Sequence, residues 1–448
     1  MIALILHRIA GQGFPAPWVD EVDFLEPAAQ LARHGTLRVP PLLAPEGMFW
    51  LPDLFTFLLA PIYRVFPTTI DVARWCMFGA VVGSSVGFWV AARRAGARPG
   101  IAGALVGVWL CMPRVVVMGN VARHEAVVVF FLAWALAATF SGRRVLALSL
   151  AALAALTHPA GVVYAVVVAA ANLRRRDHKP TLGWEWAVVA AVVALVLFEL
   201  AHFGSNAAIA VEQLRFQLER KAGRPSLTPP WLLGVITMAV FLVSQRVRDR
   251  AGWQSALLVR AAFCGYLVSV IGVEMWYEVL GVDLAILLLA LAFLVSPLGV
   301  AATAQLHRVI AASLVAALLV PIFYASPWHG MRIGTRSDEW NDFVADVRHE
   351  LRALSEKSDR RRTVVLSSFS GLPWPVEADA IGQLELYKET EAVRANRPFD
   401  YFLFVQAECC EGAPGGTEVF KVDSTGGNFH VVMIKDPTVE GRPYWDRQ

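Results

Sequence analysis

The chain has 448 residues and a mass of 49.0 kDa, and 56% of its residues are hydrophobic while only 17% are charged. Average soluble domains carry about 25% charged residues, and the mean hydropathy of +0.51 is far too apolar for such a domain. This composition excludes a soluble enzyme and a disordered chain. The five cysteines, two of them adjacent, give neither a disulfide framework nor the spacing of a metal site.

The net charge of +3 hides an asymmetry between two parts of the chain. Residues 1–326 carry 25 Lys or Arg and 17 Asp or Glu, whereas residues 327–448 carry 15 and 20. We therefore expect an α-helical polytopic membrane domain over residues 1–326, with an outer loop over residues 15–68. A small extracytoplasmic α/β domain is expected to follow over residues 327–448.

Apolar runs long enough to cross a membrane, about 20 residues for roughly 30 Å of hydrocarbon, recur along the first part. The run over residues 1–14 is short and lacks the cleavage site of a signal peptide, so it predicts a first span. The run over 145–173 is too long for one crossing. Because Pro159 disfavours helix at His158, this run predicts two spans that meet at a turn. The remaining spans bring the total to about 11: 72–92, 101–118, 123–140, 184–203, 230–244, 256–273, 279–296 and 309–325.

Lys and Arg gather in four loops between these spans, and all four loops fall on one side of the membrane. The positive-inside rule makes that side cytoplasmic, so the C-terminal domain faces outward. The Ala/Val/Arg-rich composition favours a bacterial inner membrane. The loops contain Arg93, Arg94 and Arg98; Arg143 and Arg144; residues 174–176 and Lys179; and Arg246, Arg248 and Arg250.

Most acids of the membrane part lie on the opposite side from these bases. Only Asp177, Glu185 and Asp249 are at the cytoplasmic face. Ionisable groups at membrane depth are costly and mark sites or pathways, which places any chemistry on the outer face. Alternatively, outer loops simply tolerate acids where bases are excluded. The outer acids are Asp20, Glu21, Asp23, Glu26, Glu46, Asp53, Asp71, Glu125, Glu199, Glu212, Glu219, Glu274, Glu278 and Asp283.

The tail has the pattern of a small α/β domain. Residues 337–357 have helical spacing, and Ser337 is a suitable N-cap. The runs 363–369, 401–406, 419–423 and 429–434 are typical of strands. No glycine-rich phosphate loop or nucleophile elbow is found in the tail, which favours a lid or docking module. Cys409 and Cys410 are most simply two buried thiols. The apolar face of the predicted helix contains Trp340, Phe343, Val347, Leu351 and Leu354.

The first outer loop begins Pro17-Trp18-Val19-Asp20-Glu21 and continues as a short helix that ends at Gly35. An amphipathic run over 49–66 then predicts a helix at the membrane interface. This loop, the Arg123-His124-Glu125 motif, the Thr157-His158-Pro159 turn and the outward tail together resemble the GT-C superfamily of membrane glycosyltransferases. Within it, the chain looks most like the family 39-like branch of protein mannosyltransferases and the aminoarabinose transferase of lipid A. The short N-terminal span departs from the pattern of that branch.

The resemblance implies transfer of a monosaccharide from a polyprenyl-phosphate donor to an acceptor hydroxyl of a lipid, glycan or protein, with membrane lipids and no nucleic acid as further partners. An inverting transfer needs a carboxylate to take the acceptor's proton. By match to the family pair, Asp20 is the candidate base and Glu21 the candidate positioning group. The alternative is that the pair lies in a surface acidic loop, or that Asp20 caps a helix, since Asp is a favoured cap. A carboxylate pair can also bind Mg²⁺ or Mn²⁺, although this branch is not generally metal-dependent.

Several further residues are candidates for substrate binding, each with a structural alternative. Arg123 suits a phosphate, since its planar fork can engage two oxygens, and Glu125 would hold it in place. An Arg at a helix end with a local ion pair is the alternative. His158 can contact sugar or phosphate, or serve a structural role. Tyr277 and Glu278 suit a sugar ring, yet an interfacial aromatic belt with Trp276 has the same composition.

The outer loop over 204–229 predicts an amphipathic helix on the membrane surface. Arg215 and Lys221 are candidate contacts for lipid phosphate, because bases on the outer side run against the orientation rule. Ion pairs with Glu212 and Glu219 are the alternative, and we favour it.

Two other classes of function remain open. A transporter or flippase of lipid-linked glycans ranks second, because the two halves show no repeat and the acids lie at one face. A non-catalytic subunit with a GT-C-like fold is the third.

Overall fold

The structure is a computed structural model that describes residues 19–39, 47–174, 179–221, 252–271, 279–295, 337–367, 377, 381–388, 398–406, 415–427, 430–439 and 442–443. The chain divides into two compact units. Unit 1 is Met1–Arg8, Phe49–Phe55 and Trp75–Gly330, and unit 2 is Ile9–Met48, Thr56–Arg74 and Met331–Gln448. The predicted domain boundary between residues 326 and 327 lies outside the described residues and stays a prediction.

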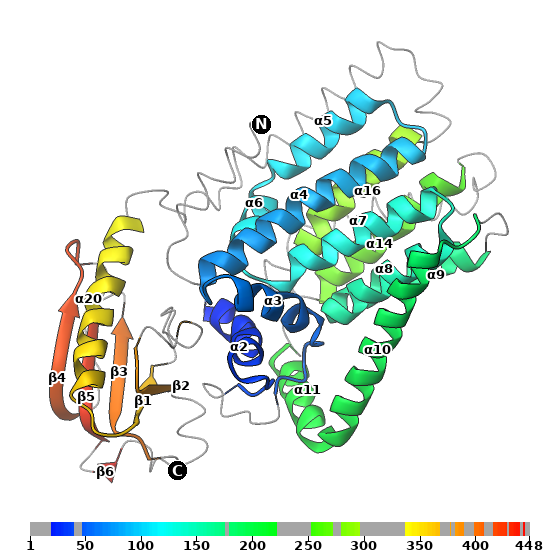
Figure 1. Ribbon diagram of the computed structural model, residues 1–448. Helices are drawn as coiled ribbons and strands as arrows, with labels where there is room; N and C mark the ends of the chain where they lie inside the picture. The colour runs from blue at the N-terminus through cyan, green and yellow to red at the C-terminus, as the bar shows by residue number, and fades with distance from the viewer. Residues whose placement is uncertain are drawn as a thin grey trace. The chain divides into compact units, whose positions relative to one another are not determined.

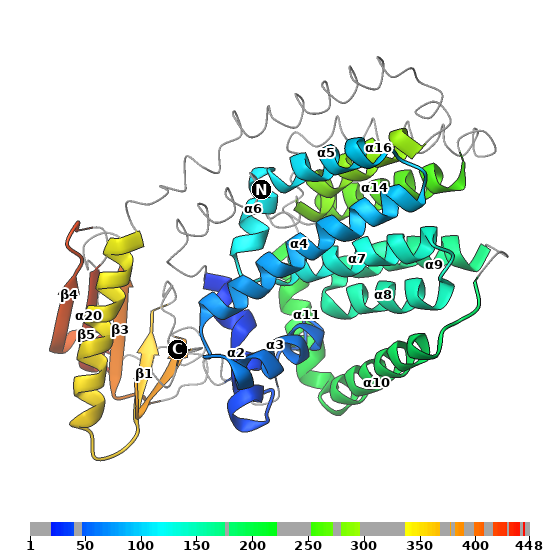
Figure 2. The same ribbon diagram turned by 45° about the horizontal axis from the view of Figure 1, so that its top comes forward.

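Unit 1 is a bundle of mostly apolar helices, and the first residues of α4, up to Arg74, belong to unit 2 (Figure 1). The short connections make α7, α8 and α9 successive neighbours, and these helices lie side by side in Figure 2 as well. Helix α14 packs against α9 and α16. The helices of the bundle are α4 (Ile70–Arg94), α5 (Pro99–Leu110), α6 (Pro113–Asn120), α7 (His124–Phe140), α8 (Arg144–Thr157), α9 (Pro159–Arg174), α10 (Gly183–Ser205), α11 (Ala207–Lys221), α14 (Trp253–Ile271) and α16 (Leu284–Val295).

Among the described residues, α4 and α10 are each long and apolar enough to cross a membrane. Five other helices are apolar but shorter, and α8 has only 14 residues, or about 21 Å at 1.5 Å per residue. The predicted turn in the long run 145–173 is confirmed: α8 ends at Thr157, His158 is extended and α9 begins at Pro159. The predicted spans 1–14, 230–244 and 309–325 lie outside the described residues, so the total of about 11 stays a prediction.

The run 101–118, predicted as one span, is instead broken. Helices α5 and α6 are bent by 72° at a short break. Pro113 begins α6, and Met112 before it is extended, with φ −65° and ψ 133°. The cause is steric, because a proline ring disfavours helical backbone at the preceding residue.

Helices α9 and α14 and the turn before α16 are in close contact within unit 1. A π-helical turn, Val279–Asp283, precedes α16. The Tyr164 hydroxyl of α9 donates a hydrogen bond to the Leu280 carbonyl of this turn. A Cβ atom on Gly265 of α14 would lie 2.6 Å from the Tyr164 hydroxyl oxygen and 3.1 Å from the Leu280 carbonyl oxygen. Only glycine fits there without displacing its neighbours.

Unit 2 contains α2 (Val19–His34) and most of α3 (Leu54–Val65). Both confirm helices predicted in the outer loop. The amide of Gly35 bonds the Leu31 carbonyl at 3.1 Å, and Gly35 has φ +68°. A residue in this left-handed conformation is a common helix terminator, and glycine adopts it without a steric penalty.

Unit 2 also contains a six-stranded sheet in the order β2-β1-β3-β5-β4, with β6 paired to β5. Strands β2, β1 and β3 are parallel, whereas β3, β5 and β4 are antiparallel. The four predicted strands are confirmed, and β2 and β6 were not predicted. The strands are β1 (Arg362–Leu366), β2 (Leu384–Lys388), β3 (Tyr401–Gln406), β4 (Gly415–Asp423), β5 (His430–Val439) and β6 (Arg442–Pro443).

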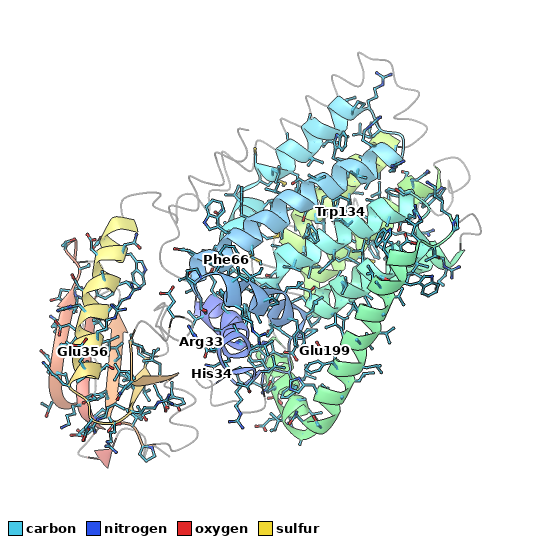
Figure 3. The ribbon with its side chains drawn as sticks, viewed as in Figure 1. Arg33, His34, Phe66, Trp134, Glu199 and Glu356 are labelled. Carbon is cyan, nitrogen blue, oxygen red and sulfur yellow. The ribbon has the colours of Figure 1, made fainter. Side chains whose placement is uncertain are left out.

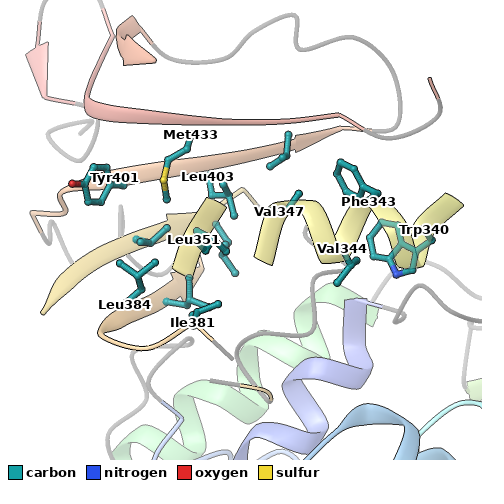
Figure 4. Packing of buried hydrophobic residues seen from close by; sticks show 14 residues of the cluster. Trp340, Phe343, Val344, Val347, Leu351, Ile381, Leu384, Tyr401, Leu403 and Met433 are labelled. Carbon is teal, nitrogen blue, oxygen red and sulfur yellow. The ribbon is translucent and has the colours of Figure 1, made fainter. Parts of the chain in front are cut away.

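Helix α20 (Ser337–Glu356) covers one face of this sheet (Figure 4). Its predicted apolar face is confirmed, because Trp340, Phe343, Val347 and Leu351 are buried and Leu354 packs beside them. The side chains that meet them come from alternate positions of the strands, including Val364, Leu403 and Met433. The tail therefore has its own hydrophobic core.

Candidate active site

A buried ion pair lies where α7 begins. Arg123 precedes the helix with extended backbone, and its Nε and Nη2 donate to the two carboxylate oxygens of Glu125 at 3.3 and 3.2 Å. The exposed fractions are 5% for Arg123 and 2% for Glu125. The predicted contact between these two residues is therefore present. Such a pair presents a guanidinium whose orientation is fixed, as phosphate recognition requires.

Two histidines lie beside this pair. The ring of His124 is 6.2 Å from that of His158 and 4.1 Å from that of Phe55, measured between centroids. His158 accepts the Ala160 amide hydrogen at Nδ1, 3.1 Å away, so it caps the start of α9. The structural role considered for His158 is thus present, and its contact with substrate stays a prediction. His124, the middle residue of the Arg-His-Glu motif, was not singled out from the sequence.

A second polar group in unit 1 joins the segment before α3 to α10. The Asp53 amide donates to Glu199 Oε1 at 2.6 Å, and the Asp53 carboxylate is 2.9 Å from His202 Nδ1. Figure 3 shows Glu199 on α10. The Phe49 amide donates to Gln213 of α11 at 2.8 Å. Sequence reasoning counted Asp53 and Glu199 only as outer acids and missed His202. The sequence did contain a signal for this group, because Glu199 and His202 both lie near one end of the predicted span 184–203.

Basic residues of two predicted loops lie at the opposite end of the unit 1 helices. Arg143 Nη1 donates to the Pro180 carbonyl at 3.2 Å and lies 3.8 Å from Glu185 Oε1. The Lys179 amide bonds the Gly142 carbonyl at 3.0 Å. Two of the predicted basic loops thus meet at one end of unit 1. Arg123, His158 and Asp53 belong to the helix ends away from these loops.

Unit 2 holds the buried pair formed by Glu21 and Arg74. Arg74 donates from Nε and Nη2 to the two Glu21 oxygens at 3.0 and 2.7 Å, and Glu21 is fully buried. The pair links α2 to the first turns of α4. Arg74 lies inside the predicted span 72–92 and was not weighed from the sequence. Asp20 precedes Glu21 on α2, and its side chain is outside the described set.

Two further carboxylates of unit 2 are removed from solvent, Glu26 fully and Glu377 partly. Glu26 accepts a hydrogen bond from Gln30 at 2.7 Å through Oε1, while its Oε2 is buried without a hydrogen bond among the described residues. Burial raises the pKa of Glu26 from 4.5 to about 8. Glu377 lies 3.4 Å from the Ile70 amide at the start of α4 and 3.4 Å from Arg348 of α20. Burial raises the pKa of Glu377 as well.

The remaining predicted residues are not gathered with these groups in the part of the chain that is described. Arg215 on α11 is 79% exposed in its side chain and pairs with Glu219 at 2.7 Å, which bears out the favoured ion pair. Lys221 ends α11, and its side chain is not described. Tyr277 and Glu278 lie outside the described residues, as does the vicinal pair Cys409 and Cys410.

Of the candidate metal pair Asp20 and Glu21, only the Glu21 side chain is described. No group of three or more His, Cys, Asp or Glu side chains in the described ranges could hold a metal ion. Both oxygens of Glu21 already accept hydrogen bonds from Arg74. A carboxylate neutralised by a guanidinium is a poor ligand for a hard cation. Glu21 is therefore a poor candidate for a metal ligand, and the possibility of a bound Mg²⁺ or Mn²⁺ stays open as a prediction.

No protein-family model and no curated protein matches the sequence. Among solved structures, ArnT from Cupriavidus metallidurans bound to undecaprenyl phosphate matches with a TM-score of 0.55 at 14% identity, covering 96% of each chain. The apo state of the same protein also gives 0.55, at 13% identity and 96% coverage of each chain. The Archaeoglobus fulgidus oligosaccharyltransferase gives a TM-score of 0.36 at 12% identity, covering 90% of this chain and 68% of the other.

The two ArnT matches show first that the chain has a known helical fold that carries a small sheet. More narrowly, the fold is similar to that of ArnT over nearly the full length of both chains. The expected helical, ArnT-like fold is thereby confirmed, whereas the number of spans and the extracytoplasmic C-terminal domain stay predictions.

Proposed function

We propose that this protein is an integral membrane glycosyltransferase. It transfers a monosaccharide from a polyprenyl-phosphate donor to an acceptor hydroxyl at the outer face of the membrane. The observation that carries this proposal is the likeness to ArnT over nearly the full length of both chains, because that protein was solved with undecaprenyl phosphate bound.

The buried groups of unit 1 suit one half of this reaction. As the bond between the anomeric carbon and the phosphate oxygen breaks, negative charge grows on the departing phosphate. Arg123 is proposed to stabilise that charge, since a preorganised cation acts most strongly where charge develops. Glu125 keeps the guanidinium oriented through its two hydrogen bonds. His158 is proposed as a neighbouring contact, and Arg215, Lys221, Tyr277 and Glu278 as outer contacts for lipid or sugar.

Asp20 is proposed for the other half of the reaction, by its match to the family pair. Its carboxylate takes the proton of the acceptor hydroxyl while the hydroxyl oxygen forms the new bond to the anomeric carbon. Glu21 supports Asp20 indirectly, because its bonds to Arg74 fix this end of α2. Neither step requires a metal ion.

The proposed setting is a bacterial inner membrane crossed about 11 times, with the C-terminal α/β domain outside the cytoplasm. The meeting of Arg143 with the 179–185 segment at one end of unit 1 supports this orientation. A reporter fused after Gln448 is expected to be active outside and one fused at Arg176 inside. A cytoplasmic tail would contradict the proposed placement of the site.

The activity is tested with the purified full chain in lipid nanodiscs. Labelled monosaccharides on undecaprenyl phosphate serve as donors, and a membrane lipid and glycan extract supplies acceptors. Asp20→Asn keeps the side-chain shape but cannot take the proton, so we expect a loss of about 10²–10⁴-fold in turnover with donor binding retained. Arg361→Gln, which alters an exposed ion pair of the tail, is the control.

Three results would change this proposal. Near-wild-type turnover by Asp20→Asn at saturating donor and acceptor would exclude Asp20 as the base. Rescue of that variant by Mn²⁺ would indicate a metal site. Donor binding by the wild type with no transfer from any donor would favour a non-catalytic subunit.

A further inference from the structure

Two connections that carry basic residues are joined at one end of unit 1. The Lys179 amide donates to the carbonyl of Gly142 at 3.0 Å. Beside it, Arg143 Nη1 donates to the Pro180 carbonyl at 3.2 Å. Gly142 has φ +75°, and a Cβ atom on it would lie 3.7 Å from Lys179 Cγ. The aliphatic part of Lys179 therefore lies against the glycine turn, and the two connections form one continuous surface.

This surface carries a net positive charge. The side chain of Arg143 is 27% exposed, Lys179 is exposed, and Arg144 at the start of α8 is partly exposed. Within segments 142–144 and 179–185, the acidic residue beside these bases is Glu185, 3.8 Å from Arg143. Glu185 is only 1% exposed, and it accepts the Leu182 amide hydrogen at 2.9 Å. Because the acid is buried and the bases are accessible, the positive charge faces outward.

Three tryptophans lie at the same end of unit 1. Trp184 and Trp186 are in the first turn of α10, and they are 53% and 58% exposed. Successive helical residues are about 100° apart around the axis, so the two indoles flank the buried Glu185 on either side. Trp253 begins α14, and its ring is 5.5 Å from that of Phe140, the last residue of α7.

The tryptophans indicate where this surface lies relative to a membrane. Helix α10 is long and apolar enough to cross one. Its exposed residues Val193, Leu197 and Leu200 are spaced to share one face, which suits contact with hydrocarbon. Exposed tryptophans at the end of such a helix are typical of the headgroup level of a bilayer. The bases of the joined connections therefore lie at the level of the lipid phosphates.

We propose that Arg143, Arg144 and Lys179, with Trp184 and Trp186 beside them, bind the headgroup of an anionic phospholipid. We call these five residues the basic patch. The guanidinium and ammonium groups engage the lipid phosphate, while the indoles pack against the glycerol and the first part of the acyl chains. A zwitterionic headgroup would leave the charge of the patch uncompensated, so an anionic lipid is preferred. This inference goes beyond the proposed glycosyl transfer and requires only that α10 crosses the membrane.

The experiment measures lipid binding to the purified full chain by native mass spectrometry. The probes are dioleoyl phosphatidylglycerol and dioleoyl phosphatidylcholine, which have the same acyl chains and differ in headgroup charge. The variants are Lys179→Gln, Arg143→Lys and the double variant Arg143→Gln with Lys179→Gln. Arg361→Gln is the matched control, because Arg361 also forms an exposed pair with a glutamate, Glu385 of the tail, at 2.9 Å.

We expect the wild type to bind phosphatidylglycerol at least about tenfold more tightly than phosphatidylcholine. Lys179→Gln should reduce this preference about fivefold, and the double variant should abolish it, because each base near an anionic lipid adds a similar increment. Arg143→Lys keeps the charge and should retain most of the preference. The control variant should bind both lipids as the wild type does.

Several results would overturn the proposal. One is equal affinity of the wild type for the two lipids, and another is an unchanged preference in the double variant. Lys179→Gln keeps the backbone bond to Gly142 and replaces an exposed side chain, so it tests the patch even where the double variant does not fold. An unchanged preference in Lys179→Gln would also count against the patch. Displacement of phosphatidylglycerol by soluble glycerol 3-phosphate would show that a free phosphate, and not a lipid, is recognised.

Discussion

Among the described residues, each unit holds a buried Arg–Glu pair, and the two pairs differ in the sequence separation of their partners. Glu21 and Arg74 are 53 residues apart and connect α2 to α4. Arg123 and Glu125 are two residues apart at the start of one helix. The bonds of the long-range pair are shorter, 2.7 and 3.0 Å against 3.2 and 3.3 Å.

This difference separates two uses of the same chemistry. A pair that joins two helices contributes to tertiary structure, because neither side chain can move without the other helix. A pair within one turn leaves the helix packing untouched and fixes only the direction of the guanidinium. A pair that joins two helices is suited to hold a neighbouring residue such as Asp20 in place. A pair within one turn is suited to present Arg123 to a ligand.

Breaking the long-range pair should have the largest effect on stability. Glu21→Gln leaves the buried Arg74 guanidinium without its counter-charge, which typically costs about 3–5 kcal/mol. Glu125→Gln should lower the free energy of unfolding by only about 1–3 kcal/mol, because Arg123 can adjust within its own turn. Chemical denaturation in detergent measures both. Equal losses would contradict the distinction between the pairs.

Glu26 of α2 is also a buried carboxylate, but no cation hydrogen-bonds to it in the described residues. It therefore shows what burial does to a carboxylate that lacks such a partner. Its pKa is raised from 4.5 to about 8 by burial, so the folded protein holds a proton that the unfolded chain releases. This contribution to stability is complete below pH 4.5 and declines as pH rises through about 8. We expect Glu26→Gln to flatten that decline. Thermal unfolding between pH 5 and 9 measures it, and an unchanged slope would show that Glu26 is not its source.

The exposed pair of Arg215 and Glu219 should show the smallest effect. Surface pairs four residues apart on a helix contribute about 0.3–0.5 kcal/mol and are screened by salt. We expect Arg215→Gln to leave the unfolding temperature unchanged at 150 mM salt, a concentration at which surface charges act over only about 8 Å. A clear loss of undecaprenyl phosphate binding in this variant would instead support its candidate role as a lipid contact.

Local patterns predicted much of the structure. The end of α2 at Gly35, the turn at Pro159 and the apolar face of α20 each depend on residues close together in the sequence. The Arg123–Glu125 contact follows from the same proximity. The bend at Pro113 could have been predicted by the rule already applied to Pro159. Strand β2 also carries an alternating pattern, since Leu384 and Leu386 are buried, but it is only five residues long.

The long-range contacts could not be predicted in this way. Arg74 lies within an apolar run, and nothing in the sequence pattern indicates its partner. Its contact with Glu21 is seen only in the folded structure. No spacing rule joins Asp53 to His202 across 149 residues. Single residues such as Glu199 can be placed at a helix end by topology, while their partners depend on how the helices pack.

The meeting of Tyr164, Gly265 and Leu280 constrains how the protein is made. Tyr164 and Leu280 are 116 residues apart, so the tyrosine is synthesised and inserted well before its partner exists. A tyrosine hydroxyl left within hydrocarbon has no water to bond, and the fit of α14 tolerates nothing larger than hydrogen at Gly265. Helix α9 therefore completes its packing only after the π-helical turn has left the ribosome. A chain truncated before residue 279 would expose this polar surface to the insertion machinery and to membrane proteases.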